Sequence, residues 1–440
     1  MKLKFKYSFL LIRIMKLNEI LVSERIIEAK SGFEKSFQNY LKNFNSAKEV
    51  VGEKQIEEIK KRLKEIKKYS IKNLEQLKEK TVKNLSAQGI KVFEAKDAEE
   101  ARKIIEKIIP KGELIVKSKS NTLNEIEIVE NLKGRNEFIE TDCGDFLVEI
   151  CEEKGTHPVT PAIHLSEERI VKVIEKKFGI VIEPKAEKIA EWVKNYLREK
   201  ILKAKFGLTG ANAISADGNI AILENEGNIS LVTRLPENHI IVAGIEKIVP
   251  SIEDALLVCR ASAIWGTGAS WPAYINLISS PSKTADIQKE VVKGMHGAKE
   301  VYLILLDNGR KKAIEDGLEE ALYCINCGAC LYFCPVYRQI FDNYGFHYLA
   351  GIGITKTSFM NDLKTAFEKG LYYCTTCKAC KQNCPLEIDI PELVKKVREK
   401  AVKNKIETEA NRKMIENIKK VGNPFGEIKE GEIPKELYCC

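Results

Sequence analysis

At 440 residues, with 44% hydrophobic and 30% charged residues, the chain has the composition of a globular protein of two or three domains. Its net charge of +8 comes without a basic run interleaved with aromatic residues, which argues against a nucleic-acid-binding groove. No apolar run approaches the roughly 20 residues that span a bilayer.

The N-terminal stretch "MKLKFKYSFLLIRIM" has a short apolar core that Arg13 interrupts, and no small-residue cleavage site follows it. We therefore expect a flexible extension, with either Met1 or Met15 as the start, on a cytoplasmic protein. In a reducing compartment, clustered cysteines predict metal ligands and not disulfides.

Residues 1–85 are predicted to form an N-terminal helical extension. The apolar residues Ile56, Ile59, Leu63 and Ile66 recur at helical spacing and make one stripe that packs against the next domain. Over residues 54–83 many lysines alternate with glutamates, which predicts a solvated helix face.

Residues 86–310 alternate between short apolar runs and amphipathic segments, which predicts an α/β domain with a mostly parallel sheet. In such sheets ligands bind beyond the carboxyl ends of the strands. The expected strands are 114–117, 137–141, 220–223, 239–245 and 301–306, and the expected helices are 97–109 and 185–205.

Residues 311–405 change in character, because cysteine clusters replace the strand-like runs and lie between helical segments such as 361–373 and 391–405. The remaining residues, 406–440, are predicted to form a C-terminal tail, irregular after Gly422. Cys439 and Cys440 end it, as metal ligands, as partners of another protein's thiol, or as part of a mobile end.

Two motifs share the pattern Cys-x-x-Cys-x-x-Cys-x-x-x-Cys-Pro, in "CINCGACLYFCP" (324–335) and "CTTCKACKQNCP" (374–385). Three cysteines at steps of three wrap one face of an iron–sulfur cubane, and the fourth ligates the other cluster in two-cluster proteins. Zinc knuckles seldom use four cysteines at this spacing followed by proline. The motifs therefore predict two [4Fe–4S] clusters, held by Cys324, Cys327, Cys330 and Cys384, and by Cys374, Cys377, Cys380 and Cys334.

The long helical linker between the motifs, residues 335–373, resembles that of the α-helical ferredoxins, such as those in succinate dehydrogenase and in the C-type component of heterodisulfide reductase. Lys378 and a first cysteine at 374 are also like that component. Modules of this kind relay electrons inside larger complexes. The resemblance predicts an all-α ferredoxin domain at 311–405.

Ahead of the motifs, "IVKSKSNTLNEI" (115–126), "FIETDCGDFLVEI" (138–150), "HPVTPAIH" (157–164), "GLTGANAISADGNIAILENEGN" (207–228) and "DNGR" (307–310) resemble the LUD (lactate-utilisation) domain. The whole arrangement is most similar to the lactate utilisation protein B family. The resemblance implies a fold like that of the ribose-5-phosphate isomerase and CoA-transferase superfamily. It also implies two partners, namely a cysteine-rich, heterodisulfide-reductase-B-like protein and a second LUD protein.

Several polar residues in these stretches are candidates for a ligand pocket. Lys117 and Lys119 follow a strand and are placed to meet a carboxylate, while Asn212 and Asn228 offer amide donors. Glu226 resembles the glutamate that acts as nucleophile in CoA transferases, so it is the weak catalytic candidate. Solvated lysines and ordinary turns are the alternative interpretation of the same residues.

His157 and His164 are interpreted as hydrogen-bonded structural histidines and not as metal ligands. The chain has neither a dinucleotide fingerprint nor a Walker loop, so neither NAD nor flavin is predicted.

Three functions remain open. The first is an electron-transfer subunit of a complex that oxidises an organic acid, with L-lactate as the implied substrate and no flavin in this chain. The second is a heterodisulfide-reductase-like relay in which the LUD domain is a scaffold. The third is a CoA- or phosphosugar-type enzyme with redox-sensing clusters.

Overall fold

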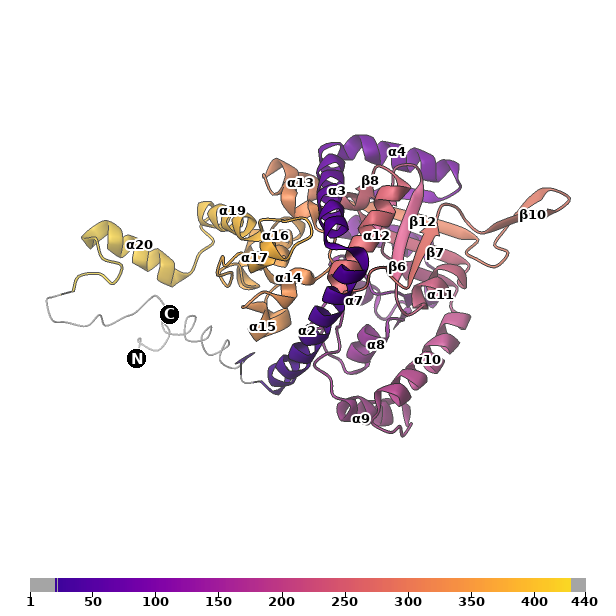
Figure 1. Cartoon of the computed structure of the whole chain (residues 1–440), viewed down its shortest axis with the longest axis horizontal. Helices are drawn as coiled ribbons and strands as arrows, with labels where there is room; N and C mark the ends of the chain where they lie inside the picture. Colours follow the sequence, from indigo (N-terminus) through magenta and orange to yellow (C-terminus); the bar gives the residue numbers. More distant parts are fainter. Residues whose placement is uncertain (1–19, 22, 429–440) are drawn as a thin grey trace.

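The computed structural model describes residues 20, 21 and 23–428. Cys439 and Cys440, and both candidate start residues, lie outside these described residues. Figure 1 shows the N-terminal helices standing between two regions, a sheet-containing body and a group of C-terminal helices. No helix in the described part of the chain is long and apolar enough to cross a membrane.

Three helices form the N-terminal region, α2 (Glu24–Val51), α3 (Glu53–Lys72) and α4 (Leu74–Ala87). Gly52 separates the first two, because its φ of 88° is a conformation that helices do not contain. The predicted stripe Ile56–Ile66 is buried in the same core as residues of the C-terminal helices. The stripe therefore joins the two regions as well as covering one of them.

The predicted solvated face of this helical region is partly wrong. Lys67 and Lys78 are 2% and 8% exposed, although most of their lysine neighbours face solvent. Lys78 is held by Glu75 at 3.1 Å and Glu94 at 2.6 Å. The i+3 and i+4 spacing of charges cannot distinguish such lysines from solvated ones, because the partners Glu94 and Glu246 lie on other elements of the fold.

The main sheet has six parallel strands in the order β1-β12-β7-β4-β2-β3, which confirms the α/β prediction. Alternate residues enter different cores on its two faces, as the pleat of a strand requires. The bounds are β1 (Lys91–Ala95), β2 (Leu114–Lys117), β3 (Glu137–Glu140), β4 (Phe206–Thr209), β7 (Asn238–Gly244) and β12 (Glu300–Leu306).

Helices cover both faces of this sheet. Their bounds are α5 (Ala98–Ile108), α6 (Asn121–Glu125), α7 (Ile128–Leu132), α8 (Cys143–Ile150), α9 (Glu167–Phe178), α10 (Ala186–Lys203) and α11 (Asn228–Arg234). Gly207 in β4 is required by packing, because a Cβ there would lie 2.1 Å from the carbonyl oxygen of Val232. The predicted helices 97–109 and 185–205 correspond to α5 and α10.

A second sheet, in the order β8-β5-β6-β9, was not predicted. The expected strand 220–223 belongs to it and pairs antiparallel with both neighbours. Its strands are β5 (Ala213–Ser215), β6 (Asn219–Glu224), β8 (Ile248–Val249) and β9 (Tyr274–Ile278), with η1 (Ile245–Lys247) before β8 and α12 (Ile252–Thr267) packed against it. A hairpin, β10 (Lys283–Ile287) and β11 (Glu290–Lys293), projects from the body (Figure 1).

The C-terminal region is helical, as predicted. Its elements are α13 (Arg310–Glu315), η2 (Glu319–Tyr323), α14 (Ala329–Tyr332), α15 (Tyr337–Ile340), η3 (Phe341–Asn343), α16 (Ala350–Met360), α17 (Leu363–Glu368), α18 (Ala379–Gln382), α19 (Ile390–Lys403) and α20 (Glu409–Val421). Helix α16 lies at the centre, since nearly all of its residues are buried. Helix α20 lies in the predicted tail, extends away from the other helices (Figure 1) and buries none of its residues.

Candidate iron–sulfur site

The two cysteine motifs fold into loops of the same shape. In each loop the residue before the second cysteine has a left-handed backbone, Asn326 at φ 58° and Thr376 at φ 57°. The residue after the second cysteine does too, Gly328 at φ 81° and Lys378 at φ 65°. A four-residue helix, α14 or α18, then carries the third cysteine. The two motifs therefore share the same backbone turns as well as the same cysteine spacing.

One cavity has cysteines from both loops in its wall. Three of them, Cys374, Cys377 and Cys380, come from the second loop, whereas Cys334 is the last cysteine of the first. Cys330 also reaches this wall. Burial, with repulsion from the thiolates of Cys334 and Cys374, raises the pKa of Cys380 to about 12. The last cysteine of the first loop thus lies with the second loop.

The reciprocal arrangement occurs on the other side. Burial raises the pKa of Cys384, the last cysteine of the second loop, to about 11, and the thiolate of Cys324 adds to the rise. Burial also raises the pKa of Cys327 above its ordinary range, with Cys384 and Cys324 contributing. Cys330 is buried among the same thiolates. Cys384 is therefore close to the first loop.

These two groups of thiols fit iron–sulfur clusters by their chemistry. Each group is made only of soft sulfur ligands, and closely spaced buried thiolates need cationic metal between them. In the described ranges, no three His, Cys, Asp or Glu side chains converge tightly enough for a single metal ion. We call the group with Cys324, Cys327, Cys330 and Cys384 the inner site, and the group with Cys334, Cys374, Cys377 and Cys380 the outer site.

Hydrogen bonds fix the loops around both sites. The backbone N–H of Asn326 donates to Cys324 Sγ at 3.4 Å, and that of Tyr337 donates to Cys334 Sγ at 3.5 Å. Arg398 on α19 donates to the carbonyl oxygens of Leu371 and Cys374 at 3.1 and 2.7 Å. Donors to thiolate sulfur are among the features that set cluster potentials.

The two sites differ in their exposure. Cys384 of the inner site is buried, and a Cβ on Gly266 of α12 would lie 3.1 Å from the carbonyl oxygen of Cys327. Cys377 of the outer site is exposed. The inner site therefore faces the sheet-containing region, and the outer site faces solvent.

Two consecutive segments of the chain match known families. Residues 78–306 match the LUD domain, and residues 320–388 match a 4Fe-4S dicluster domain. Lactate utilization protein B of Macrococcus caseolyticus is 32% identical, over 77% of this chain and 70% of that protein. The proteins of the same name from Bacillus pumilus and Bacillus subtilis are 33% and 32% identical, over 76% and 77% of this chain and 70% of each.

The chain belongs to the lactate utilization protein B family. It combines a LUD domain with a C-terminal [4Fe–4S] region. Among solved structures, a DUF162 family protein from Deinococcus radiodurans aligns with 53% of this chain and 98% of its own length. That likeness, at 12% identity and a TM-score of 0.30, is too weak to inform the fold.

The pocket candidates of the LUD domain are engaged with protein groups. Lys117, at the end of β2, forms a buried ion pair with Glu140 at the end of β3. Lys119 lies 3.2 Å from a carboxylate oxygen of Asp145 and 3.9 Å from one of Asp142. The two lysines therefore already have carboxylate partners within the protein.

The other three candidates are divided between two places. The side-chain oxygen of Asn212 accepts from the backbone N–H of Leu223 at 3.0 Å, which stabilises the β5–β6 pair. Asn228 donates to Thr141 Oγ1 at 3.1 Å, and Glu226 accepts from the N–H of Cys143 at 3.1 Å. Surrounding protein and the carboxylate of Asp142 raise the pKa of Glu226 to about 6, although its side chain still reaches solvent.

The predicted structural histidines have partners within the protein. Nδ1 of His157 lies 3.1 Å from the backbone nitrogen of Val159, which donates to it. His164 lies between Thr156 Oγ1, at 3.2 Å, and Glu153 Oε2, at 2.9 Å. These contacts favour the structural interpretation.

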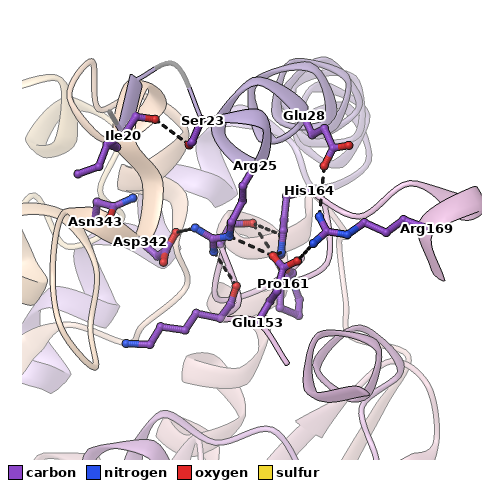
Figure 2. Close-up of polar contacts among 12 residues, drawn as sticks. Ile20, Ser23, Arg25, Glu28, Glu153, Pro161, His164, Arg169, Asp342 and Asn343 are labelled. Atoms are coloured by element: carbon purple, nitrogen blue, oxygen red, sulfur yellow. Dashed lines mark hydrogen bonds and ion pairs between the residues drawn. The ribbon is translucent and has the colours of Figure 1, made fainter. Parts of the chain in front are cut away.

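The contacts of Glu153 continue across the domain boundary, as Figure 2 shows. Arg25 of α2 reaches Glu153 at 3.1 Å, the carbonyl oxygen of Lys154 at 2.9 Å, and Asp342 of the ferredoxin region at 2.9 Å. Arg169 of α9 binds the other oxygen of Glu153. Arg25 thus links the LUD domain to the iron–sulfur region through the N-terminal helix.

Sequence reasoning missed a buried charge network beneath the inner site. Arg310 is fully buried and donates to both oxygens of Glu125 at 2.8 and 2.9 Å. It also pairs with Glu246. Tyr348 donates to Glu125 at 2.8 Å from the ferredoxin side. Arg310 and Glu125 lie in the stretches "DNGR" and "NTLNEI" that resemble the family, and that resemblance was the only signal available for them.

Proposed function

We propose that this protein is an electron-transfer subunit that carries two [4Fe–4S] clusters with crossed ligation. Cys384 completes the inner site and Cys334 completes the outer site. The observation that supports this most directly is the cavity whose wall combines Cys334 with the three spaced cysteines of the second loop. When bound, the clusters supply one-electron transfer, and the protein holds them by thiolates and backbone N–H donors.

The names of its relatives direct the proposal toward lactate. Proteins called lactate utilization protein B are about a third identical to this chain over the aligned residues, so we propose that the electrons come from oxidation of L-lactate or a related 2-hydroxy acid. We further propose that the two-electron step occurs on a partner. The proposed partners are a cysteine-rich, heterodisulfide-reductase-B-like protein and a second LUD protein.

The exposed outer site is the proposed point of exchange with that partner. Cys377 reaches the surface, whereas the inner site is enclosed by α3, α12 and the LUD domain. Electrons would therefore enter or leave through the outer site. Inside the protein, electrons would pass between the inner and the outer site. The two sites adjoin at Cys330, an inner-site residue that also lines the outer cavity.

One observation favours the LUD domain as a scaffold. Lys117 and Lys119, the candidates for substrate carboxylate binding, are paired with Glu140 and Asp145. A scaffold role predicts that Glu226→Gln leaves electron transfer from substrate unchanged in the assembled complex. Loss of that activity with both clusters intact would instead favour an enzyme active site in the LUD domain.

Replacing each crossed cysteine, Cys384 or Cys334, by serine tests the crossed ligation of the two clusters. Anaerobically purified protein should contain about eight iron atoms, from two four-iron clusters, and show two EPR-active centres on reduction. Cys384→Ser should remove the inner signal and keep the outer one, and Cys334→Ser should do the reverse. Cys151→Ser, outside both sites, is the matched control and should keep both.

The result that contradicts crossed ligation is equally specific. If Cys334→Ser removes the same signal as Cys324→Ser, each loop ligates its own cluster. If the protein contains zinc and no iron after anaerobic purification, the electron-transfer role itself is wrong. An anaerobic pull-down with the tagged chain, followed by assays of 2-hydroxy acids with a dye acceptor, tests the partners and the substrate.

A further inference from the structure

Three lysines are buried beside the inner site, and they come from three different parts of the chain. Lys67 lies on α3, Lys247 on η1 of the LUD domain and Lys356 on α16 of the ferredoxin region. Their exposures are 2%, 7% and 1%. Buried lysines are rare unless they are paired, so this group needs an explanation.

Lys356 is connected to the inner site through one residue. Its ammonium donates to Asn326 Oδ1 at 2.6 Å and lies 4.4 Å from the ring centre of Tyr348. Asn326 in turn donates its backbone N–H to Cys324 Sγ at 3.4 Å. A charge on Lys356 is therefore held close to the cluster and cannot swing into solvent.

Lys67 and Lys247 meet in the same buried region. Lys67 donates to the carbonyl oxygen of Glu246, the residue before Lys247. Burial lowers the pKa of both lysines, and repulsion from Lys356 adds to that lowering, whereas the carboxylate of Glu246 and then the thiolate of Cys324 oppose it. When charged, the three lysines repel one another and are attracted to Glu246 and to the thiolate of Cys324.

The protein's own carboxylates do not balance these charges. Glu125 and Glu246 are the two acids in this network, and Arg310 already binds both of them. Three lysines and one arginine therefore face two carboxylates. Uncompensated buried charge is costly, so a negative group is expected beside the lysines. A thiolate-bound iron–sulfur cluster has net negative charge and fits that requirement.

We propose that Lys247 and Lys356, assisted by Lys67, act as a built-in counter-charge that raises the reduction potential of the inner cluster. This inference rests on the proposed function. Reduction adds one electron to a cluster that is already negative, and nearby fixed cations favour the more negative state. Burial has the opposite effect, so the lysines allow an enclosed cluster to accept electrons from its exposed neighbour.

An EPR-monitored redox titration of the full chain tests this role. In the titration, dithionite and mediators supply one electron to each cluster, and no bond in the protein forms or breaks. Lys356→Gln and Lys247→Gln should each shift the midpoint of the inner cluster to lower potential and leave that of the outer cluster unchanged. The Cys334→Ser background isolates the inner signal.

Two matched controls separate charge from packing. Lys356→Arg keeps the positive charge and should retain the wild-type midpoint more closely than Lys356→Gln. Lys78→Gln removes another buried lysine, which pairs with Glu75 and Glu94 outside this network, and should leave both midpoints unchanged. If the glutamine variants lose inner-site iron while Lys356→Arg retains it, the counter-charge role is also supported.

The proposal is overturned if the glutamine variants assemble both clusters with unchanged midpoints. It is also overturned if both clusters shift equally, or if Lys356→Arg loses the inner cluster together with the glutamine variants. These outcomes differ from failure of the proposed function, in which the wild-type chain itself contains no iron.

Discussion

The two cysteine loops have the same spacing and the same left-handed turns but occupy different surroundings. Gly328 of the first loop packs against the LUD domain, and a Cβ there would lie 3.3 Å from Pro158 Cγ. Lys378 occupies the equivalent position of the second loop and is exposed. The cysteine pattern therefore fixes the local fold, while the neighbouring domain determines how each site is enclosed and charged.

The two sites also differ in the arginine that lies near each of them. Arg310, below the inner site, is fully buried and binds Glu125 and Glu246. Arg398, behind the outer site, is half-buried and donates only to the carbonyl oxygens of Leu371 and Cys374. Arg310 neutralises buried carboxylates, whereas Arg398 holds backbone carbonyl groups in place.

We expect Arg310→Met to lower the free energy of unfolding by about 3–5 kcal/mol, because it leaves two buried carboxylates without the guanidinium that pairs with both. Arg398→Met should lower it by about 1–2 kcal/mol, since water can replace hydrogen bonds at a half-buried site. Urea unfolding of the anaerobic protein measures both. Equal losses would mean that the two arginines contribute equally, in spite of their different burial.

Acid should affect the first loop before the second. His157 packs against Tyr332 of α14 with ring centres 4.7 Å apart, and burial lowers its pKa to about 3. The unfolded chain takes up a proton near the ordinary pKa of about 6.5, so the folded state loses stability as pH falls below that value. At pH 5 this amounts to about 2 kcal/mol, from roughly 1.4 kcal/mol per pH unit.

The measurement compares wild type with His157→Gln by urea unfolding at pH 7.5 and pH 5. Wild type should lose about 2 kcal/mol more than the variant over this range. Hydrogen exchange should place the loss at residues 328–332 and not at 378–382. A variant that is as acid-sensitive as wild type would assign the effect to other titrating groups.

The sequence predicted the elements that carry strong local patterns. The predicted strands 114–117, 137–141, 239–245 and 301–306 are all members of the main sheet. Three of them are nearly continuous apolar runs, whereas 137–141 has only Phe138 and Ile139 at its centre. The second sheet escaped prediction because β5 and β8 have three and two residues. Strands this short depend on their neighbours and have no periodicity of their own.

The residues of the candidate site also divide into those that could be predicted from the sequence and those that could not. The cysteines could be recognised because their spacing reflects the shape of a cluster, independently of the rest of the chain. Lys67 could not, because it lies in a lysine-rich helix where its neighbours are solvated. Only the approach of η1 and α16 distinguishes it, and those elements are about 180 and 290 residues away along the chain.

Replacing the left-handed residue that follows the second cysteine should change the free energy of unfolding in opposite directions in the two loops. Gly328→Ala introduces a Cβ at φ 81° against Pro158 and should lower the free energy of unfolding by about 1 kcal/mol or more. Lys378→Gly removes a side chain from φ 65° on the exposed loop and should raise it by about 1 kcal/mol. Urea unfolding with iron content as a control measures both changes. If both substitutions destabilise the protein, Lys378 has contacts that outweigh its backbone strain, and the second loop is then less independent of its surroundings than its exposure indicates.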